Sequence, residues 1–595
     1  MGNGVLDLEM ACGTVEGRDN QQKSSGPVSG RKPTGKALIM RIEILEARIA
    51  PASLTVTTIA DSGAGSLRAQ ITQANTNGGS NTITFASGLH GKILLDSLLP
   101  AITNALTITG PGAPRLSIDG HGAGVIFDVE STGGAVAISG LTLTHGQSIT
   151  GGAVYINDSG QTVTITGCLI TKNQAVGRTG SEASGGGIDV EAGTLNLINS
   201  TVSGNIAKGG AANSVDMNGG GARGGGIYLY TGATAVLTNS VISGNKALGA
   251  NGANGATGAS GAKGIGSNPG TAGAAGVDGG HGGGAYGGGI ISRCGYLTIS
   301  DSTISGNFAM AGHGGNGGAG GRGGAGGTHN IGGNGGAGGN AGEPGVAYGG
   351  GISTYGIHNG GSEGSFDISR STISGNACAG NIGGTGGAGG AAGSGSIVSG
   401  GHAIHATAGS RGTNGERFYA YGGGIQSYNE TSATLSQVTI ANNTADSCAG
   451  VFFNYGTSDL VTNSTIAFNK SRRGDISGGL GTSHGAAVDV ISTVVGQNTA
   501  AGKVSDVQGS ITADASLFES STGFTILGGA TNNILGKSPL LGGLGHHGGT
   551  MLTCLPSSRS PLLNAGSDPF ALGTDQRGDP REIGVKTDIG AVEVG

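Results

Sequence analysis

Carboxylates and histidines are the side chains of this sequence that could do acid–base or metal chemistry, and they are widely scattered. Asp189 and Glu191 stand two positions apart, a spacing that places both on one face of a β-strand, where they could hold a cation. A calcium site needs about six to eight oxygen ligands, and two acids without a carbonyl-rich loop do not supply them. We therefore interpret this pair as solvated.

The sequence also shows no pair of carboxylates placed for polysaccharide cleavage. A glycosidase needs two carboxyl groups within about 5 to 9.5 Å of each other. Asp367 and Asp489 take the same outward position in the repeat described below, but they stand three units apart, roughly 14 Å at the spacing of stacked strands. There is no Asp-Asp pair, and Gly-His-Gly, at 120–122, 280–282 and 312–314, is expected by chance in a chain with 132 Gly among 595 residues. We predict no catalytic pair.

Histidines and C-terminal charges complete the candidates. His402-x-x-His405 and His546-His547 lack acidic or thiol partners nearby in the sequence, so we predict no metal and no cofactor. Five charged residues near the C-terminus are interpreted as ion-paired residues that close the last coil rather than as an active site: Asp575, Arg577, Arg581, Asp588 and Glu593. A row of outward threonines could bind a flat ligand: Thr201, Thr303, Thr372, Thr439 and Thr465. Threonine is also an ordinary polar residue of β-strands, and we favour this second interpretation.

Composition limits the class of protein. The net charge is -6, which gives no basic footprint for nucleic acid and no polybasic patch for a membrane surface. No run reaches the roughly 18 apolar residues of a membrane span. Hydrophobic residues make up 36% of the chain, enough for a packed core. The six cysteines lack metal-ligand spacing and are interpreted as small buried residues: Cys12, Cys168, Cys294, Cys378, Cys448 and Cys554.

A repeat positions these residues. Units such as Ser302-Thr-Ile-Ser-Gly-Asn307 recur, a β-branched residue stands three places before each asparagine, and most units open with Gly-Gly-Gly-Ile. The apolar alternation is that of strands, so each unit is predicted to hold three short strands and two turns. Eight asparagines share this register: Asn173, Asn205, Asn245, Asn307, Asn376, Asn443, Asn469 and Asn498.

The spacing between these asparagines varies from 26 to 69 residues while the core of the unit stays constant. Loops alone vary, which favours a coil of stacked parallel strands over repeats of fixed length. Turn asparagines tolerate left-handed geometry, and stacked amides can hydrogen-bond from coil to coil, so we predict an asparagine ladder. Coils are expected from about residue 80, with an α-helix at Ser66–Asn75 covering the open end of the first one.

Three long inserts leave the coil at one corner, at residues 246–286, 308–348 and 377–421, and glycine recurs in them at every third position. Collagen is excluded because proline is scarce. A left-handed extended helix has three residues per turn, so glycine on one face would let neighbours approach closely. We predict extended hairpins stacked side by side, with flexible loops as the open alternative.

These motifs resemble those of bacterial right-handed parallel β-helix surface proteins. Asp61-Ser-Gly-Ala-Gly-Ser-Leu-Arg68 resembles their opening motif, and the Gly-Gly-Gly-Ile and Ile-x-x-Asn units are similar to the repeats of polymorphic outer-membrane proteins. Ser560–Gly566, Thr574–Arg581 and Asp588–Glu593 closely resemble the choice-of-anchor Q domain. The resemblance implies an all-β right-handed parallel β-helix with a short capping helix over residues 52–535, and a choice-of-anchor Q-like cap over 536–595.

The first 51 residues are expected to be a disordered or targeting segment. Ile42-Glu-Ile-Leu-Glu-Ala-Arg-Ile-Ala-Pro51 resembles the LEPR-type motif of exported bacterial proteins, whereas residues 1–36 are polar and unpatterned. We expect residues 1–36 to add nothing to the fold, either as a disordered segment or as a misplaced start.

Location and function follow from the resemblance and from the missing catalytic pairs. We expect a non-enzymatic, extracellular or cell-surface β-helix, adhesin-like or in contact with matrix, whose partners are polysaccharide or cell-surface components. The alternative is a polysaccharide lyase or hydrolase on the same scaffold, with acids supplied by loops.

Overall fold

The computed structural model describes residues 52–594 except 131–133, 357–363, 396–404, 429–431, 457, 474–475 and 529–531. The expectations for residues 1–36, for the LEPR-like motif and for Cys12 lie outside the described residues. Among those described, no helix is long and apolar enough to cross a membrane.

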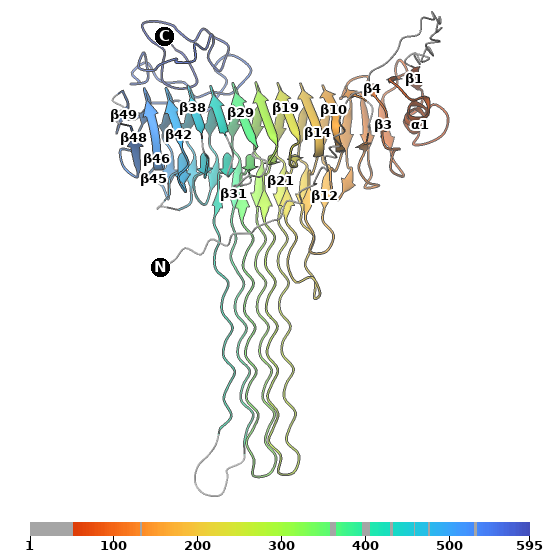
Figure 1. The fold of residues 1–595 in the computed structure, drawn as a ribbon, viewed down its shortest axis with the longest axis vertical. Helices are drawn as coiled ribbons and strands as arrows, with labels where there is room; N and C mark the ends of the chain where they lie inside the picture. Colours follow the sequence, from red (N-terminus) through yellow and green to blue (C-terminus); the bar gives the residue numbers. More distant parts are fainter. Residues whose placement is uncertain are drawn as a thin grey trace, which may run out of the picture. The chain divides into compact units, whose positions relative to one another are not determined.

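Short strands stack in parallel along one axis and form a right-handed parallel β-helix, as predicted (Figure 1). The largest sheet, sheet A, runs in two lanes that β10, β14 and β46 join. Its first lane contains β6 (Phe127–Val129), β10 (Val154–Thr166), β14 (Ile188–Ile198), β18 (Ile227–Leu229), β23 (Ile290–Arg293), β28 (Ile352–Tyr355), β33 (Ile425–Tyr428), β37 (Val451–Asn454), β41 (Leu480–Ser483) and β46 (Val507–Asp514). Its second lane adds β1 (Ala52–Val56), β2 (Asn81–Phe85), β4 (Leu106–Thr109), β7 (Val136–Ser139), β19 (Thr234–Thr238), β24 (Tyr296–Ser300), β29 (Ser365–Ser369), β34 (Ser432–Ser436), β38 (Asp459–Thr462), β42 (Val488–Ile491) and β48 (Phe524–Leu527).

Sheet B carries the Thr-Ile-Ser part of the repeat. Its strands are β3 (Gly91–Leu94), β5 (Leu116–Asp119), β8 (Thr142–Thr144), β11 (Leu169–Thr171), β15 (Thr201–Ser203), β20 (Val241–Ser243), β25 (Thr303–Ser305), β30 (Thr372–Ser374), β35 (Thr439–Ala441), β39 (Thr465–Ala467), β43 (Val494–Gly496), β47 (Leu517–Phe518) and β49 (Ile534–Leu535).

Two further sheets were not predicted, because their strands are only two or three residues long. Sheet C contains β9 (Gln147–Ser148), β12 (Gln174–Val176), β16 (Ile206–Lys208), β21 (Lys246–Leu248), β26 (Phe308–Met310), β31 (Ala377–Ala379), β36 (Thr444–Ala445), β40 (Lys470–Ser471), β44 (Thr499–Ala500) and β45 (Lys503–Val504). Sheet D contains β13 (Ala183–Ser184), β17 (Ala222–Arg223), β22 (Ala285–Tyr286), β27 (Ala347–Tyr348) and β32 (Ala420–Tyr421). A unit such as 285–310 therefore has five strands rather than the predicted three.

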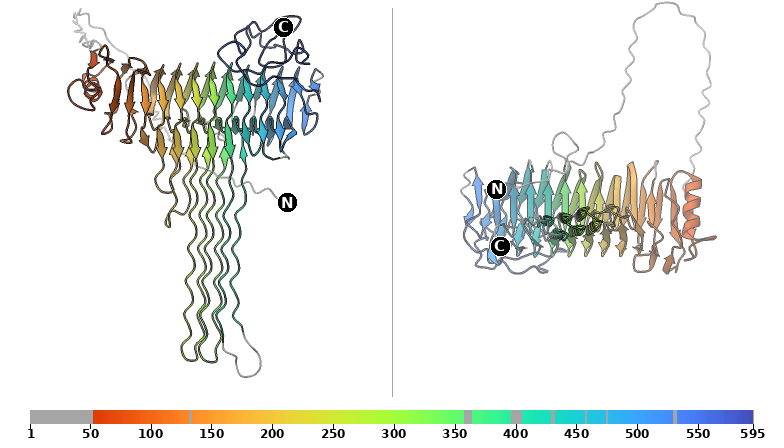
Figure 2. Two further views of the ribbon diagram at one scale, coloured as in Figure 1. Left: turned by 180° about the vertical axis from the view of Figure 1, so that it is seen from behind. Right: turned by 90° about the horizontal axis from the view of Figure 1, so that it is seen from below.

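The capping helix is confirmed. α1 spans Leu67–Asn77, Ser66 Oγ accepts the Ala69 N–H as its N-cap, and Leu67, Ile71 and Ala74 are buried. The helix packs against β1 and β2 at the end of the stack (Figure 2). The expected start near residue 80 is wrong, because β1 precedes the helix and pairs with β2 in register.

The core consists of aliphatic rows, and an asparagine ladder runs beside them. All eight asparagines are fully buried, and each side-chain oxygen after the first accepts the backbone N–H and Nδ2 of the preceding asparagine at 2.9–3.0 Å. The ladder is confirmed, but the asparagines do not have the left-handed backbone conformation that the sequence suggested for them. Positive φ falls one position earlier, at Gly204, Gly244, Gly306 and Gly375 among others.

A second ladder, which the sequence reasoning missed, is made by the first serine of the repeat. Ser200, Ser240, Ser302 and Ser371 each accept, through Oγ, a backbone N–H from the preceding coil at 3.0–3.2 Å. The five described cysteines are buried and none of them forms a disulfide, as expected for small core residues.

The described parts of the three long inserts are extended chains that run side by side away from the coils, and we call them the glycine fin (residues 249–284, 312–346, 380–395 and 405–419) (Figures 1 and 2). Backbone N–H groups donate between neighbouring chains at every third residue, for example Gly315, Gly318 and Gly321 to the 271–283 segment at 2.8 Å. A Cβ added to Gly318 would lie 1.9 Å from the carbonyl oxygen of Ala256. Close approach therefore requires glycine, and the hairpin prediction is confirmed over the flexible alternative.

Candidate functional site

The sequence-predicted candidates occupy separate places. Asp367 and Asp489 are exposed and three strands apart in one row of sheet A, as predicted, and Asp489 accepts a hydrogen bond from Thr512. His402 lies outside the described residues, His405 is exposed, and the carbonyl of His547 accepts a hydrogen bond from Arg577. Within the described residues, no three Cys, His, Asp or Glu side chains are grouped so as to hold a metal ion.

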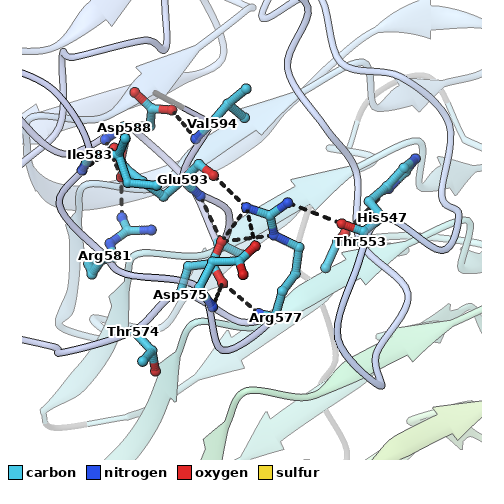
Figure 3. Close-up of polar contacts among 12 residues, drawn as sticks. His547, Thr553, Thr574, Asp575, Arg577, Arg581, Ile583, Asp588, Glu593 and Val594 are labelled. Atoms are coloured by element: carbon cyan, nitrogen blue, oxygen red, sulfur yellow. Dashed lines mark hydrogen bonds and ion pairs between the residues drawn. The ribbon is translucent and has the colours of Figure 1, made fainter.

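One ion pair joins the C-terminal charges as expected, Asp575 with Arg577, whereas the side chains of Arg581, Asp588 and Glu593 bond to backbone groups, and the five residues do not close the last coil. Buried Asp575 accepts from Arg577 Nη2 at 2.8 Å, Asp588 accepts the N–H groups of Asn564 and Val594 at 2.7 and 2.8 Å, and Glu593 accepts that of Asp588 at 2.9 Å (Figure 3). Burial lowers the pKa of Arg581, which donates to the Asp588 carbonyl at 3.0 Å. These contacts hold the loops of the C-terminal region together.

The C-terminal region lies along the side of the coils, over the threonine row of sheet B. Thr372 Oγ1 donates to the Leu552 carbonyl at 2.7 Å, Thr439 Oγ1 to Gln576 Oε1 at 2.5 Å, and Ala591 N–H to Thr465 Oγ1 at 3.1 Å. These threonines therefore bind the chain's own C-terminal region rather than a flat ligand.

A cluster of carboxylates and tyrosines lies instead on the first lane of sheet A. Inward residues such as Ile188 and Val190 belong to the core, so the residues between and after them form two outward rows. We call these rows the tyrosine–carboxylate strip. Its first row is Asp128, Tyr155, Asp189 and Tyr228. Its second is Glu130, Glu191, Tyr230, Arg293, Tyr355 and Tyr428, and it has no member on β10, where Asn157 pairs with Ala192 and a register shift leaves Glu191 unpaired.

In the first row Asp189 and Tyr228 are buried, on the strands that lie beside sheet D, whereas Asp128 and Tyr155 are half-buried. Asp189 is fully buried and accepts Ser184 Oγ–H through Oδ2 at 2.5 Å. Its Oδ1 has no hydrogen-bond partner among the described residues. Farther along the same register, Phe452 stacks on Tyr421 of sheet D, with ring centroids 5.0 Å apart. The solvated pair predicted from the sequence is thus wrong for Asp189, because sheet D, absent from the prediction, covers it.

Burial controls the protonation of the strip. It raises the pKa of Asp189 to about 8, against the effect of the Ser184 hydrogen bond, and raises that of Asp128 to about 6, helped by the charge of Glu130. It also raises the pKa of Glu191, which nearby Arg293 opposes, and that of Tyr155 to about 12. At neutral pH Asp189 is therefore a neutral acid that can donate a hydrogen bond.

The second row is half-buried except for the exposed Glu130, and three of its six side chains are tyrosines. The rings of Tyr355 and Tyr428 are parallel with centroids 5.0 Å apart, and the Arg293 guanidinium lies 5.4 Å from the centre of the Tyr230 ring. Because the rings stack on one another, their edges and hydroxyl groups form the accessible part. The sequence could have revealed the strip through the position of its residues in the repeat. From β14 onward, the side chains of the strip stand one or three residues after the isoleucine of Gly-Gly-Gly-Ile.

The fold thus defines the chain as a right-handed parallel β-helix with a flanking glycine fin. No protein-family model matches it, and no curated protein matches it in sequence. Among solved structures it is similar to pectate lyase Pel9A, at 11% identity and a TM-score of 0.38, over 92% of this chain and 98% of that one. The catalytic domain of a GH87 alpha-1,3-glucanase is also similar, at 11% identity and a TM-score of 0.24, over 81% of this chain and 68% of that one. Likeness at this distance does not bear on activity.

Proposed function

We propose that this chain is a non-enzymatic, secreted or cell-surface β-helix that binds polysaccharide along the tyrosine–carboxylate strip, for adhesion or matrix contact. The observation that carries the binding is the register of the strip. Its polar side chains follow seven successive strands, from β6 to β33, over about 29 Å at the usual strand spacing. A strip of this length suits a linear polymer better than a small molecule.

The chemistry of the strip supports a neutral glycan. Glu130, Glu191 and the tyrosine hydroxyls offer acceptors and donors along the strip, which suits the hydroxyl groups of a sugar chain. Stacked rings offer edges rather than faces, so hydrogen bonds rather than ring stacking would hold the ligand. Carboxylates along the row disfavour polyanions.

Affinity electrophoresis of the full chain through gels containing neutral or acidic polysaccharides tests the proposal. We expect a neutral polysaccharide to retard the wild type, and the variant Glu191→Gln/Tyr230→Phe/Tyr355→Phe/Tyr428→Phe to bind about tenfold more weakly, or about 1.4 kcal/mol. Tyr296→Phe is the matched control, since Tyr296 is 49% exposed on the second lane of sheet A. Equal retardation of wild type and quadruple variant would contradict the proposal.

The rival function is polysaccharide cleavage, and one observation favours it. Asp189 carries a proton at neutral pH, as a general acid must, and Asp128 lies two strands away, about 9.5 Å in backbone spacing. Full burial of Asp189 argues against it, because a general acid has to reach the glycosidic oxygen. Release of reducing ends from the retained polysaccharide, abolished by Asp189→Asn, would establish cleavage.

The proposed location rests on the resemblance of the end motifs to those of surface proteins. Fractionation of cells that produce the native protein tests it. Recovery in the medium or the surface fraction is expected, and recovery wholly from the cytoplasm would contradict it.

A further inference from the structure

We propose that the two faces of the glycine fin are complementary docking surfaces, by which fins of successive copies of this chain pack antiparallel into an open assembly. The fin has two layers of extended chains, because backbone hydrogen bonds join neighbouring chains within a layer, as from Gly255 to Asn316, and also join the two layers, as from Val277 to Ala256. One class of residue in each chain, every third, therefore points outward, and the two layers present two separate faces.

The front face consists of chains 250–263, 313–325 and 382–394. Its outward side chains stand in register across the three chains, as shown by Asn251 accepting the His313 N–H at 2.9 Å and Asn316 accepting the Thr385 N–H at 2.8 Å. Most are small or neutral. The charged ones are Arg322 and Lys263, both exposed, in the two rows next to the tips of the hairpins. The front face is therefore basic at the tip.

The back face consists of chains 272–281, 334–343 and 407–416. Here Asp278 accepts the Asn340 N–H at 2.6 Å, Asn340 accepts the Thr413 N–H at 3.0 Å, and Glu343 accepts the Glu416 N–H at 2.7 Å. Three carboxylates lie in the two rows nearest the coils, and the rows nearer the tips hold Ala, Ser, Thr and Asn. The back face is therefore acidic at the root.

The two patterns match when one fin is turned end to end against the next. Outward residues repeat about every 9.3 Å along a chain, so the two basic rows have the same spacing as the two acidic rows. With the fins antiparallel and fully overlapped, Lys263 of one copy faces Glu416 of the next, and Arg322 faces Asn340 between Asp278 and Glu343. Parallel fins would place the basic rows against neutral ones.

The area and the symmetry of this contact determine how copies of the chain should associate. A face of three chains by about 37 Å covers roughly 500 Å² per partner, close to the lower limit for a specific interface, so association should be weak and salt-sensitive. A front face binds a back face, so the contact is heterologous and does not close into a dimer. The average mass should keep rising with protein concentration.

Sedimentation velocity of the full chain in about 50 mM and 500 mM salt tests this. We expect concentration-dependent association at low salt that decreases at high salt. Two variants, Lys263→Glu/Arg322→Glu and Asp278→Lys/Glu416→Lys, should each stay monomeric. Their equimolar mixture should associate again with the two variants alternating, since the reversed front face of the first fits the reversed back face of the second and their unchanged faces still fit each other.

The control is Arg115→Glu/Lys503→Glu, which reverses two exposed charges outside the fin and should associate like the wild type. Circular dichroism checks that each variant is folded. A wild type that is monomeric at every concentration and salt, or association that neither fin variant changes, would overturn the proposal, and so would a mixture that stays monomeric.

Discussion

Replacing Asn307 by alanine should open the coils around it, because this side chain bonds to both neighbouring coils. Its Oδ1 accepts the backbone N–H and Nδ2 of Asn245, both at 3.0 Å, while its Nδ2 donates to the Ile242 carbonyl and to Asn376 Oδ1, both at 2.9 Å. Four hydrogen bonds are lost, and several buried groups lose a partner. At about 1 kcal/mol each, the substitution costs about 4 kcal/mol.

The loss should be local, since each coil contacts only its neighbours. Hydrogen exchange measured by mass spectrometry on full-length Asn307→Ala should show peptides from β21, β26 and β31 exchanging roughly 700-fold faster, the equivalent of about 4 kcal/mol. The control Asn196→Ala removes a partly exposed amide whose contact with Thr164 is 3.5 Å long, and it should change exchange by less than about threefold. If Asn307→Ala matched this control, the ladder would not be a source of stability.

Other predictions test the fin and the strip. Gly318→Ala should separate the fin chains, because its Cβ would lie 1.9 Å from the Ala256 carbonyl oxygen. Hydrogen exchange at residues 253–283 should therefore accelerate, whereas the control Ala319→Ser, at an outward position, should leave it unchanged. Unchanged exchange in Gly318→Ala would count against close packing of the chains. Asp189→Asn should reduce the pH dependence of stability. With a pKa of about 8, folded Asp189 keeps a proton that the unfolded chain releases near pH 4, so its stabilisation is complete below about pH 4 and is lost as the pH rises to 8. Between pH 5 and 8 the loss is at most about 4 kcal/mol in denaturant unfolding, and a wild type and variant with the same pH dependence would contradict the assignment.

The sequence predicted the features that repeat. Ile304 and Asn307 recur at a fixed distance in every unit, so the inward row and the ladder were both visible before the structure. The fin was visible for the same reason, since glycine keeps its three-residue period. A period reveals contacts between equivalent positions, whatever the length of the loops between them.

Contacts made only once could not be predicted. Gln576 bonds to Ser371 across 205 residues, and β1 pairs with β2 across the helix that separates them, and no period marks either contact. The strip was missed for a related reason. Its carboxylates could be placed on one face of a strand, but the burial that shifts the pKa of Asp189 comes from sheet D, whose strands are too short to show a pattern.

Mapping the bound polysaccharide tests the central proposal most directly. Hydrogen exchange of the full chain should be compared with and without the neutral polysaccharide that retards it in gels. We predict slower exchange in peptides that cover 154–157, 188–191, 227–230 and 290–293, and no change in the threonine row at 303–305 or in the fin. Protection confined to the fin, to sheet B or to the C-terminal region would contradict binding at the strip.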